Sequence, residues 1–198
     1  MYKSMEGVKC VVVGDHAIGK TSMLVSHTTG SYASEYVPTV FDNYCANVMV
    51  DARPISLGLW DTSATQDFDR LRPLSYKDTD VFVVCYSIVS PTSLENVRIK
   101  WIPEIRHHCP DAPLLLVGTK CDLRQDKRFL EKIKSSEMHA LVDLARAEET
   151  GTKIAAARVM ECSGKTFVGL KDVFDVAVRT ALAFRDRPRK EKTKCLVL

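Results

Sequence analysis

The strongest chemical signal in the sequence is the stretch GDHAIGKT at positions 14–21. It fits the pattern G-x-x-x-x-G-K-[ST], and it follows an apolar run and opens a helical one, as this motif requires. In such a loop, backbone N–H groups and a helix N-terminus solvate phosphate oxygens. The Lys20 ammonium would reach the β- and γ-phosphates, and the Thr21 hydroxyl would ligate Mg²⁺. The stretch therefore predicts a nucleoside triphosphate site.

A second string, TKCD at positions 119–122, follows an apolar run about 100 residues after the loop. The carboxylate of Asp122 at a strand end can accept hydrogen bonds from both the N1–H and the 2-amino group of guanine, a pair that adenine does not offer. The stem of Lys120 would cover the plane of the base. These residues predict selectivity for guanine.

The C-terminal residues form a separate chemical unit. The last four, CLVL at 195–198, fit a C-a-a-X box whose final Leu favours geranylgeranylation of Cys195. Residues 185–194 hold six Lys or Arg and two acidic residues, so they carry +4, and the rest of the chain carries about −1 of the total of +3. A lipid beside a basic run predicts binding to anionic membranes. A nearly neutral body argues against nucleic-acid binding.

Strands and helices alternate in an order that would position these motifs. Apolar runs predict strands at 9–13, 44–50, 55–60, 81–86, 114–117 and 158–162, and helical patterns cover 20–27, 93–107 and 170–184. The runs at 81–86 and 114–117 are apolar on both faces, which is typical of interior parallel strands. Residues 44–50 alternate and lead through a predicted turn into the next strand. We expect an α/β fold with a mainly parallel six-stranded sheet, one antiparallel edge pair and helices on both faces.

Length and composition fit one domain with a tail. The chain has 198 residues, of which 45% are hydrophobic and 27% charged, and we expect a domain at 1–184 followed by the tail at 185–198. The charged segment 124–136 predicts a short exposed helix, and Pro103 should kink the helix at 93–107. No apolar run is long enough to cross a bilayer, and the N-terminus lacks the apolar core of a secretory signal, so we expect the protein to be made and kept in the cytosol.

Together these motifs resemble the Rho family of small GTPases, Rac-like members above all. The resemblance runs from about Val8 to the last residue and is carried by the phosphate loop, 36–44, 59–62, 69–76, Trp101 with 107–110, 117–122, 161–163 and the C-terminal box. It implies the P-loop small GTPase fold, and it identifies 124–136 with the helix that Rho proteins contain and Ras lacks. It also implies that residues 36–44 and 63–76 are two switches that bind effector proteins.

The resemblance also implies the roles of individual site residues. Thr39 would be the second protein ligand of Mg²⁺, and Asp61 would hold the metal through water. Tyr32 stands where the family places an aromatic edge against guanine. Ser163 and the backbone N–H of Gly164 would support Asp122 and the guanine O6, although the family usually has Ala in place of Gly164. The full set of expected nucleotide contacts is Ala17, Ile18, Gly19, Lys20, Thr21, Ser22, Tyr32, Tyr36, Pro38, Thr39, Ala64, Lys120, Asp122, Leu123, Ser163, Gly164 and Lys165.

Three positions at the expected γ-phosphate depart from the family. His16 replaces a Gly whose missing side chain admits a partner's arginine finger, so the imidazole should block that finger. Ala64 replaces the Gly that donates to the γ-phosphate, and Thr65 replaces the Gln that orients the attacking water. The finger alone accelerates hydrolysis about 10³- to 10⁵-fold. With no catalytic residue intact, we predict severely impaired hydrolysis, and slow turnover left by lineage drift is the alternative.

These inferences predict a Rac-like, prenylated GTP-binding signalling protein that stays in the GTP state. We expect a monomer that recruits effectors at the cytoplasmic face of membranes, above all the plasma membrane, with a cytosolic pool. Exchange factors and a GDI-type chaperone are further expected partners. One rival function is a conventional GTPase that cycles between GDP and GTP. The other is a scaffold that no longer binds nucleotide, against which the intact motif residues argue.

Overall fold

The computed structural model describes residues 5–32, 41–135 and 141–187. Its strands are β1 (Glu6–Gly14), β2 (Phe41–Val50), β3 (Arg53–Thr62), β4 (Val81–Ser87), β5 (Leu114–Thr119) and β6 (Arg158–Glu161). Its α-helices are α1 (Lys20–Thr29), α2 (Pro91–Asn96), α3 (Ile102–His108), α4 (Lys127–Ser135), α5 (Leu144–Lys153) and α6 (Leu170–Arg185). Shorter helical turns are η1 (Gln66–Phe68), η2 (Arg72–Tyr76), η3 (Val97–Trp101) and η4 (Cys121–Arg124).

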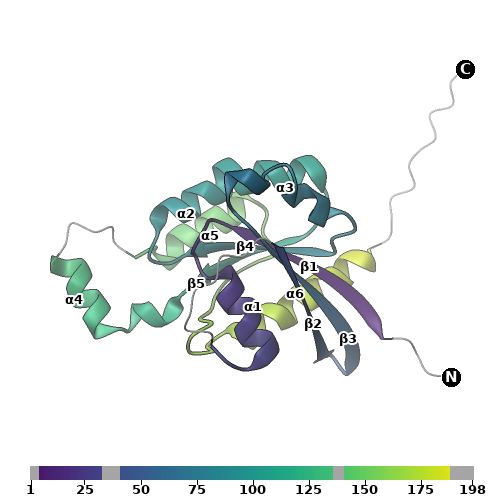
Figure 1. Ribbon diagram of the computed structural model, residues 1–198, viewed down its shortest axis with the longest axis horizontal. Helices are drawn as coiled ribbons and strands as arrows, with labels where there is room; N and C mark the ends of the chain where they lie inside the picture. Colours follow the sequence, from purple (N-terminus) through teal and green to yellow (C-terminus); the bar gives the residue numbers. More distant parts are fainter. Residues whose placement is uncertain (1–4, 33–40, 136–140, 188–198) are drawn as a thin grey trace, which may run out of the picture.

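One six-stranded sheet runs through the molecule in the order β2-β3-β1-β4-β5-β6 (Figure 1). β2 and β3 pair antiparallel at one edge, and the other neighbouring strands pair parallel. β4 and β5 are buried along their whole length, as expected for interior parallel strands. The predicted α/β fold with its antiparallel edge pair is therefore confirmed. The register places Val12 of β1 opposite Asp61 of β3, so the strand ends that flank the phosphate loop lie together.

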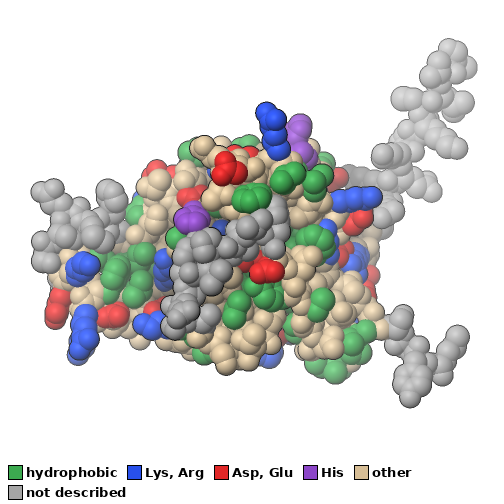
Figure 2. Space-filling model, viewed as in Figure 1, with side chains coloured by type: hydrophobic (Ala, Val, Ile, Leu, Met, Phe, Trp, Pro, Cys, Tyr) green, Lys and Arg blue, Asp and Glu red, His purple; other side chains and the backbone are tan. Residues whose placement is uncertain are grey.

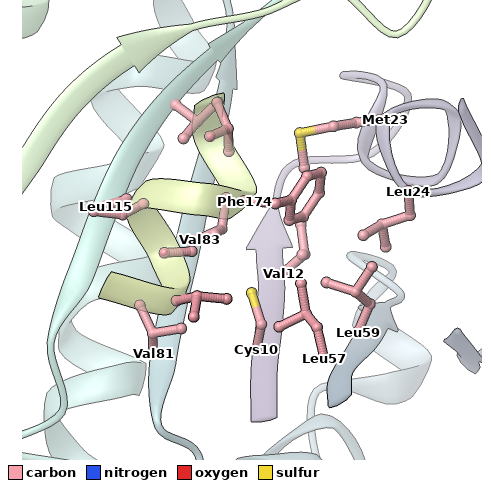
Figure 3. Close-up of a cluster of buried hydrophobic side chains, with 14 of the residues drawn as sticks. Cys10, Val12, Met23, Leu24, Leu57, Leu59, Val81, Val83, Leu115 and Phe174 are labelled. Carbon is pink, nitrogen blue, oxygen red and sulfur yellow. The ribbon is translucent and has the colours of Figure 1, made fainter. Parts of the chain in front are cut away.

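Helices cover both faces of the sheet because successive residues of a strand point to opposite sides. Cys10 and Val12 of β1 enter the core layer beneath α1 and α6, whereas Val11 and Val13 enter the layer beneath α2, α3 and α5. Figure 3 shows the ring of Phe174, from α6, in the first of these layers. Two packed layers of this kind hold the strand ends, and the loops that follow them, in fixed positions.

The helix expected at 93–107 is interrupted. Ser90 caps its start, because the Ser90 hydroxyl accepts a hydrogen bond from the Ser93 N–H at 3.3 Å, and Pro91 begins the helix. The chain then makes the π-helical turn η3 before α3 begins. Pro103 has no N–H to donate to the turn before it, so the regular hydrogen-bond ladder is broken there. The regular α-helix is thus interrupted by a widened turn immediately before Pro103.

The helix in the charged insertion begins later than predicted from the segment 124–136. The turn η4 covers Cys121–Arg124, and α4 then begins at Lys127, where the carboxylate of Asp126 accepts a hydrogen bond from the Phe129 N–H at 3.1 Å. Figure 1 shows α4 standing away from the rest of the fold. Helix α5 has no counterpart among the predicted elements. At the other end, α6 continues to Arg185, one residue beyond the predicted domain end at 184.

The surface of the described residues carries mixed charge. Figure 2 shows cationic, anionic and apolar side chains interspersed over the viewed face. Within the described ranges, no helix is both long and apolar enough to cross a membrane.

Candidate nucleotide-binding site

The phosphate loop begins where β1 must end in glycine. Gly14 has a φ of +144°, a conformation that side chains disfavour, and a Cβ at this position would lie 2.4 Å from the backbone carbonyl oxygen of Cys85. The loop ends at Gly19, which has a φ of +102° and leads directly into α1. Both glycines therefore let the backbone fold tightly between β1 and α1, so that the N–H groups at the start of α1 face the loop.

Lys20 is folded under the loop. Its side chain is buried, and its Nζ donates to the carbonyl oxygens of Gly14 at 2.9 Å and Asp15 at 2.8 Å. Burial lowers the pKa of Lys20, and the neighbouring Asp61 carboxylate partly opposes this shift. A phosphate placed in the loop would supply a second negative partner, which would stabilise the charged form of this lysine.

Thr21 and Asp61 form an oxygen donor set beside Lys20. The Thr21 hydroxyl donates to Oδ2 of Asp61 at 2.5 Å, and Asp61 is 1% exposed. Hydroxyl and carboxylate oxygens suit Mg²⁺, which keeps several waters and takes few protein ligands. The residues present therefore fit the predicted metal, with Thr21 as a direct ligand and Asp61 beside it. The other predicted ligand, Thr39, lies outside the described residues, as do the predicted contacts Tyr36 and Pro38.

A pocket at the carboxyl ends of β5 and β6 brings together most of the residues predicted to contact the base. It is lined by Gly19, Ser22, Tyr32, Thr119, Lys120, Asp122, Leu123, Ser163, Gly164 and Lys165. Lys120 adopts a left-handed conformation with a φ of +63°, and its Nζ donates to the carbonyl oxygen of Ala17 at 2.9 Å. The stem of this lysine thus spans the distance from β5 to the phosphate loop, as it must if it covers a base.

Thr119 is a site residue that the predicted contact set omitted. Its hydroxyl lies 2.5 Å from the carbonyl oxygen of Ile18 and 3.0 Å from that of Tyr86, so it ties the phosphate loop to the ends of β4 and β5. The signal was present in the TKCD string, where Thr119 directly precedes Lys120. Only the two charged residues of that string, Lys120 and Asp122, have a predicted role.

The loop that carries Ser163 closes tightly on α1. The Ser163 hydroxyl accepts hydrogen bonds from the N–H groups of Lys165 and Thr166, both at 3.1 Å. A Cβ on Gly164 would lie 2.9 Å from the backbone carbonyl oxygen of Ser22. The glycine at this position thus lets the loop approach the first turn of α1 closely.

A comparison with protein families supports what the geometry indicates. The model of the Ras family matches residues 9–183, which include the phosphate loop, the base pocket and the whole sheet apart from the first residues of β1. The chain belongs to the Ras family. It is accordingly a small GTP-binding signalling protein, and guanine nucleotide with Mg²⁺ is the ligand of this family.

In this Ras-family chain, the three unusual residues lie on two separate loops. His16 is exposed at the tip of the phosphate loop, and Ala64 and Thr65 are half-buried after the end of β3. The hydroxyls of Ser63 and Thr65 lie 2.9 Å apart, and the Thr65 N–H donates to the Ser63 hydroxyl at 3.4 Å. The side chain of Thr65 is thus held against its own backbone turn.

A buried ion-pair cluster anchors the segment that follows. Arg72 is 0% exposed, and its guanidinium donates to the carboxylate of Glu104 at 2.8 and 2.6 Å and to Asp69 at 2.7 Å. It also donates to the carbonyl oxygen of Ser63 at 2.9 Å. Burial alone would lower the pKa of Arg72, but its hydrogen bonds with Glu104 and Asp69 raise it above the ordinary value. The turn at Ser63 is therefore fixed to α3.

The interrupted helix also contacts the phosphate loop. Asn96 donates to Oδ2 of Asp15 at 2.6 Å, and the indole N–H of Trp101 donates to Oδ1 of Asp15 at 2.8 Å. The Arg72 guanidinium lies 4.8 Å from the Trp101 ring centroid. These contacts join the phosphate loop, η3 and the second predicted switch. Glu104 and Asn96 were not predicted as site residues, because nothing local in the sequence reveals partners so distant along the chain.

Proposed function

We propose that this protein is a Rac-like member of the Ras family that hydrolyses GTP poorly and signals from its GTP-bound state. The observation that carries the proposal is the turn at 63–65, where the Thr65 hydroxyl lies 2.9 Å from that of Ser63. A water-orienting side chain must reach across to the γ-phosphate. A short hydroxyl engaged with its neighbour is poorly suited to that task.

The other two substitutions act on the same step. His16 stands exposed at the tip of the phosphate loop, where an activating protein would need room to insert an arginine. Ala64 lies beside the fixed carbonyl of Ser63, so the backbone here has less freedom than a glycine would give it. The loss of a positioned water and the exclusion of an arginine both raise the hydrolysis barrier.

The binding residues remain suited to hold the nucleotide. Bound Mg²⁺ would neutralise phosphate charge, and the hydroxyl of Thr21 is placed to take it. The Lys20 ammonium, which now donates to the carbonyl oxygens of the loop, would turn toward the phosphates. An ion pair formed in this buried position would slow the release of the nucleotide. Asp122 would accept the two guanine donors while Lys120 covers the base. Tight binding with weak hydrolysis favours a long-lived GTP state.

Effector proteins would bind through residues 36–44 and 63–76. In the second segment, Leu71 is 49% exposed and Leu74 is 74% exposed, whereas Arg72 between them is fully buried. The buried arginine thus presents two leucines outward on a fixed turn. These two leucines are therefore available for contact with an effector protein.

Membrane attachment would come from the tail, of which residues 188–198 lie outside the described ranges. We propose geranylgeranylation of Cys195, with the basic run at 185–194 binding anionic lipid at the cytoplasmic face of the plasma membrane. Exchange factors and a GDI-type chaperone would control loading and the cytosolic pool. Cys195→Ser should leave the protein cytosolic in cell fractionation, and retention of this variant on membranes would show that the anchor lies elsewhere.

Single-turnover release of γ-phosphate from preloaded GTP tests the hydrolysis proposal. We expect very slow release by the wild type, little gain in Thr65→Gln alone, and recovery in the triple variant His16→Gly, Ala64→Gly, Thr65→Gln, both intrinsically and with a Rho-family activating protein. The matched control is Gln66→Ala, which should leave the rate unchanged because Gln66 is exposed on η1. Wild-type turnover like that of an ordinary Rho protein would favour the conventional GTPase. A rate loss in Gln66→Ala would show that this neighbour orients the water.

A further inference from the structure

Neither the family match nor the proposed function gives helix α4 a role, and Figure 1 shows it standing away from the sheet and the helices that cover it. Asp126 fixes the start of α4. Its carboxylate accepts a hydrogen bond from the Phe129 N–H at 3.1 Å, and its carbonyl oxygen accepts one from the Leu130 N–H at 2.9 Å. Such a cap satisfies N–H groups that the first turn leaves unpaired. The helix is therefore formed before any partner arrives.

One side of α4 is apolar. Phe129, Leu130 and Ile133 fall within an arc of about 100° when a helix has 3.6 residues per turn. The three side chains are half-buried, and among the described residues neither core layer of the fold includes them. Part of an apolar stripe thus stays at the surface, outside the hydrophobic core that packs on the sheet.

The rest of α4 is mainly cationic. Residues 127–135 hold four Lys or Arg and one acidic residue, so they carry +3. By the same count α5, with two cationic and two acidic residues, carries 0, and α6, with three and two, carries +1. Lys127, Arg128 and Lys132 are exposed. Figure 2 shows Lys and Arg side chains around apolar ones at the end of the molecule where α4 lies. This excess of cationic charge favours an anionic partner.

An anionic lipid bilayer matches both sides of the helix at once. An interfacial helix places its apolar side at the boundary of headgroups and acyl chains, while its Lys and Arg residues bind anionic headgroups. A nucleic acid would pair with the cations and leave the apolar stripe in water. We propose that α4 lies on the surface of an anionic bilayer, with Phe129, Leu130 and Ile133 toward the acyl chains. It is a second membrane contact, separate from the proposed lipid on Cys195.

Tryptophan fluorescence tests this contact on the full chain carrying Cys195→Ser, loaded with GDP and Mg²⁺. Phe129→Trp adds a reporter to the apolar stripe, and Leu74→Trp on η2, at a site 74% exposed, is the matched control. Trp60 and Trp101 are common to both proteins. With vesicles of phosphatidylserine and acyl-brominated phosphatidylcholine, we expect a blue shift and bromine quenching for the Phe129→Trp reporter alone. No quenching of that reporter, or equal quenching by vesicles without phosphatidylserine, overturns the proposal.

Further changes in the Phe129→Trp protein separate the electrostatic and apolar contributions. Lys127→Gln should lower the partition coefficient about five-fold, the effect of one cation near an anionic surface. Lys153→Gln, which removes an exposed cation of α5, is its matched control and should leave the coefficient unchanged. Ile133→Gln should also lower it about five-fold, since about half of an apolar side chain no longer enters the bilayer. Equal losses in Lys127→Gln and Lys153→Gln would show attraction without a defined contact, and would refute the assignment.

The basic tail is the competing source of lipid binding. Cosedimentation with phosphatidylserine vesicles while the Phe129→Trp reporter stays unquenched would place the contact in the tail and refute the role of α4. The apolar stripe would then be left for a protein partner. Because the protein carries Cys195→Ser and holds GDP, these outcomes are independent of geranylgeranylation and of GTP hydrolysis. Failure of this contact is therefore distinguishable from failure of the proposed function.

Discussion

The pair of Arg72 and Glu104 allows a direct test of what fixes the second predicted switch. Glu104 accepts two hydrogen bonds from Arg72, at 2.8 and 2.6 Å, and one from the Tyr76 hydroxyl at 2.5 Å. Glu104→Gln keeps the shape of the side chain and removes its charge. The loss of one partner from a buried pair costs about 3–5 kcal/mol. Because Asp69 still pairs with Arg72, we expect the lower end of that range, about 3 kcal/mol.

Urea unfolding followed by circular dichroism measures this difference. Both proteins must be saturated with GDP and Mg²⁺, because bound ligand adds to the apparent free energy of unfolding. The matched control is Glu149→Gln, which removes a solvent-exposed ion pair with Lys153 and should leave the free energy of unfolding nearly unchanged. For a chain of this size, 3 kcal/mol corresponds to a fall in Tm of about 6–12 °C. A loss in Glu104→Gln no larger than in the control would refute the reasoning.

The pH dependence gives an independent check of the same pair. Burial raises the pKa of Glu104, but the hydrogen bonds from Arg72 and Tyr76 and the positive charge of Arg72 together outweigh burial and leave the pKa below its ordinary value. The native state thus binds fewer protons here than the unfolded state does. The stability gap between wild type and Glu104→Gln should be fully present above the unfolded pKa of about 4.3, and it should vanish as the pH falls through the lower native pKa. A gap that widens on acidification would contradict this assignment.

Three further predictions concern the nucleotide site and its frame. Gly14→Ala should lower the free energy of unfolding by about 1–3 kcal/mol in denaturant titrations, because the new Cβ would clash with the backbone of Cys85. The control is Gly7→Ala on the same strand, which should leave the free energy of unfolding unchanged because its Cβ would meet nothing within 4 Å. Asp122→Asn should weaken GTP binding, measured by calorimetry, by up to about 1.5–3 kcal/mol for each of the two charge-assisted hydrogen bonds to guanine. If the wild type also binds ATP, Asp122 does not select guanine. Thr21→Asn should weaken GTP binding more than GDP binding, because the Mg²⁺ that Thr21 would hold would offset the additional negative charge of the γ-phosphate; equal losses in competition assays would count against that role.

The sheet was predictable from the sequence because its signals are local. The runs at 81–86 and 114–117 are apolar on both faces, and only an interior parallel strand buries both. The alternation of apolar and polar residues in 44–50 is also a local signal, and it predicted the edge strand with one buried face. The helix α5 was missed because Leu144–Lys153 has a weak apolar stripe, in which the buried residues are Ala147, Thr150 and Gly151.

The site was predictable where a motif carries the chemistry and unpredictable where tertiary contacts do. The phosphate loop and the TKCD string could be assigned because their residue types at fixed spacing suit phosphate and guanine. Glu104 could not be assigned, because its partner Arg72 lies 32 positions earlier and nothing in either neighbourhood indicates the other. The π-helical turn before Pro103 was equally hidden, since a proline predicts an interrupted helix without fixing the form of the interruption.

The position of Phe174 in the core has a consequence for synthesis of the protein. Val12 pairs with Val83, which lies 71 residues later in the chain, and the layer around Val12 is closed only when Phe174 arrives on α6. At about 5–20 residues per second, the ribosome needs roughly 5–20 s to pass from Val83 to Phe174. During that interval one face of the growing sheet lacks its C-terminal helix. We therefore expect the nascent chain to be a client of ribosome-associated chaperones until α6 has left the exit tunnel.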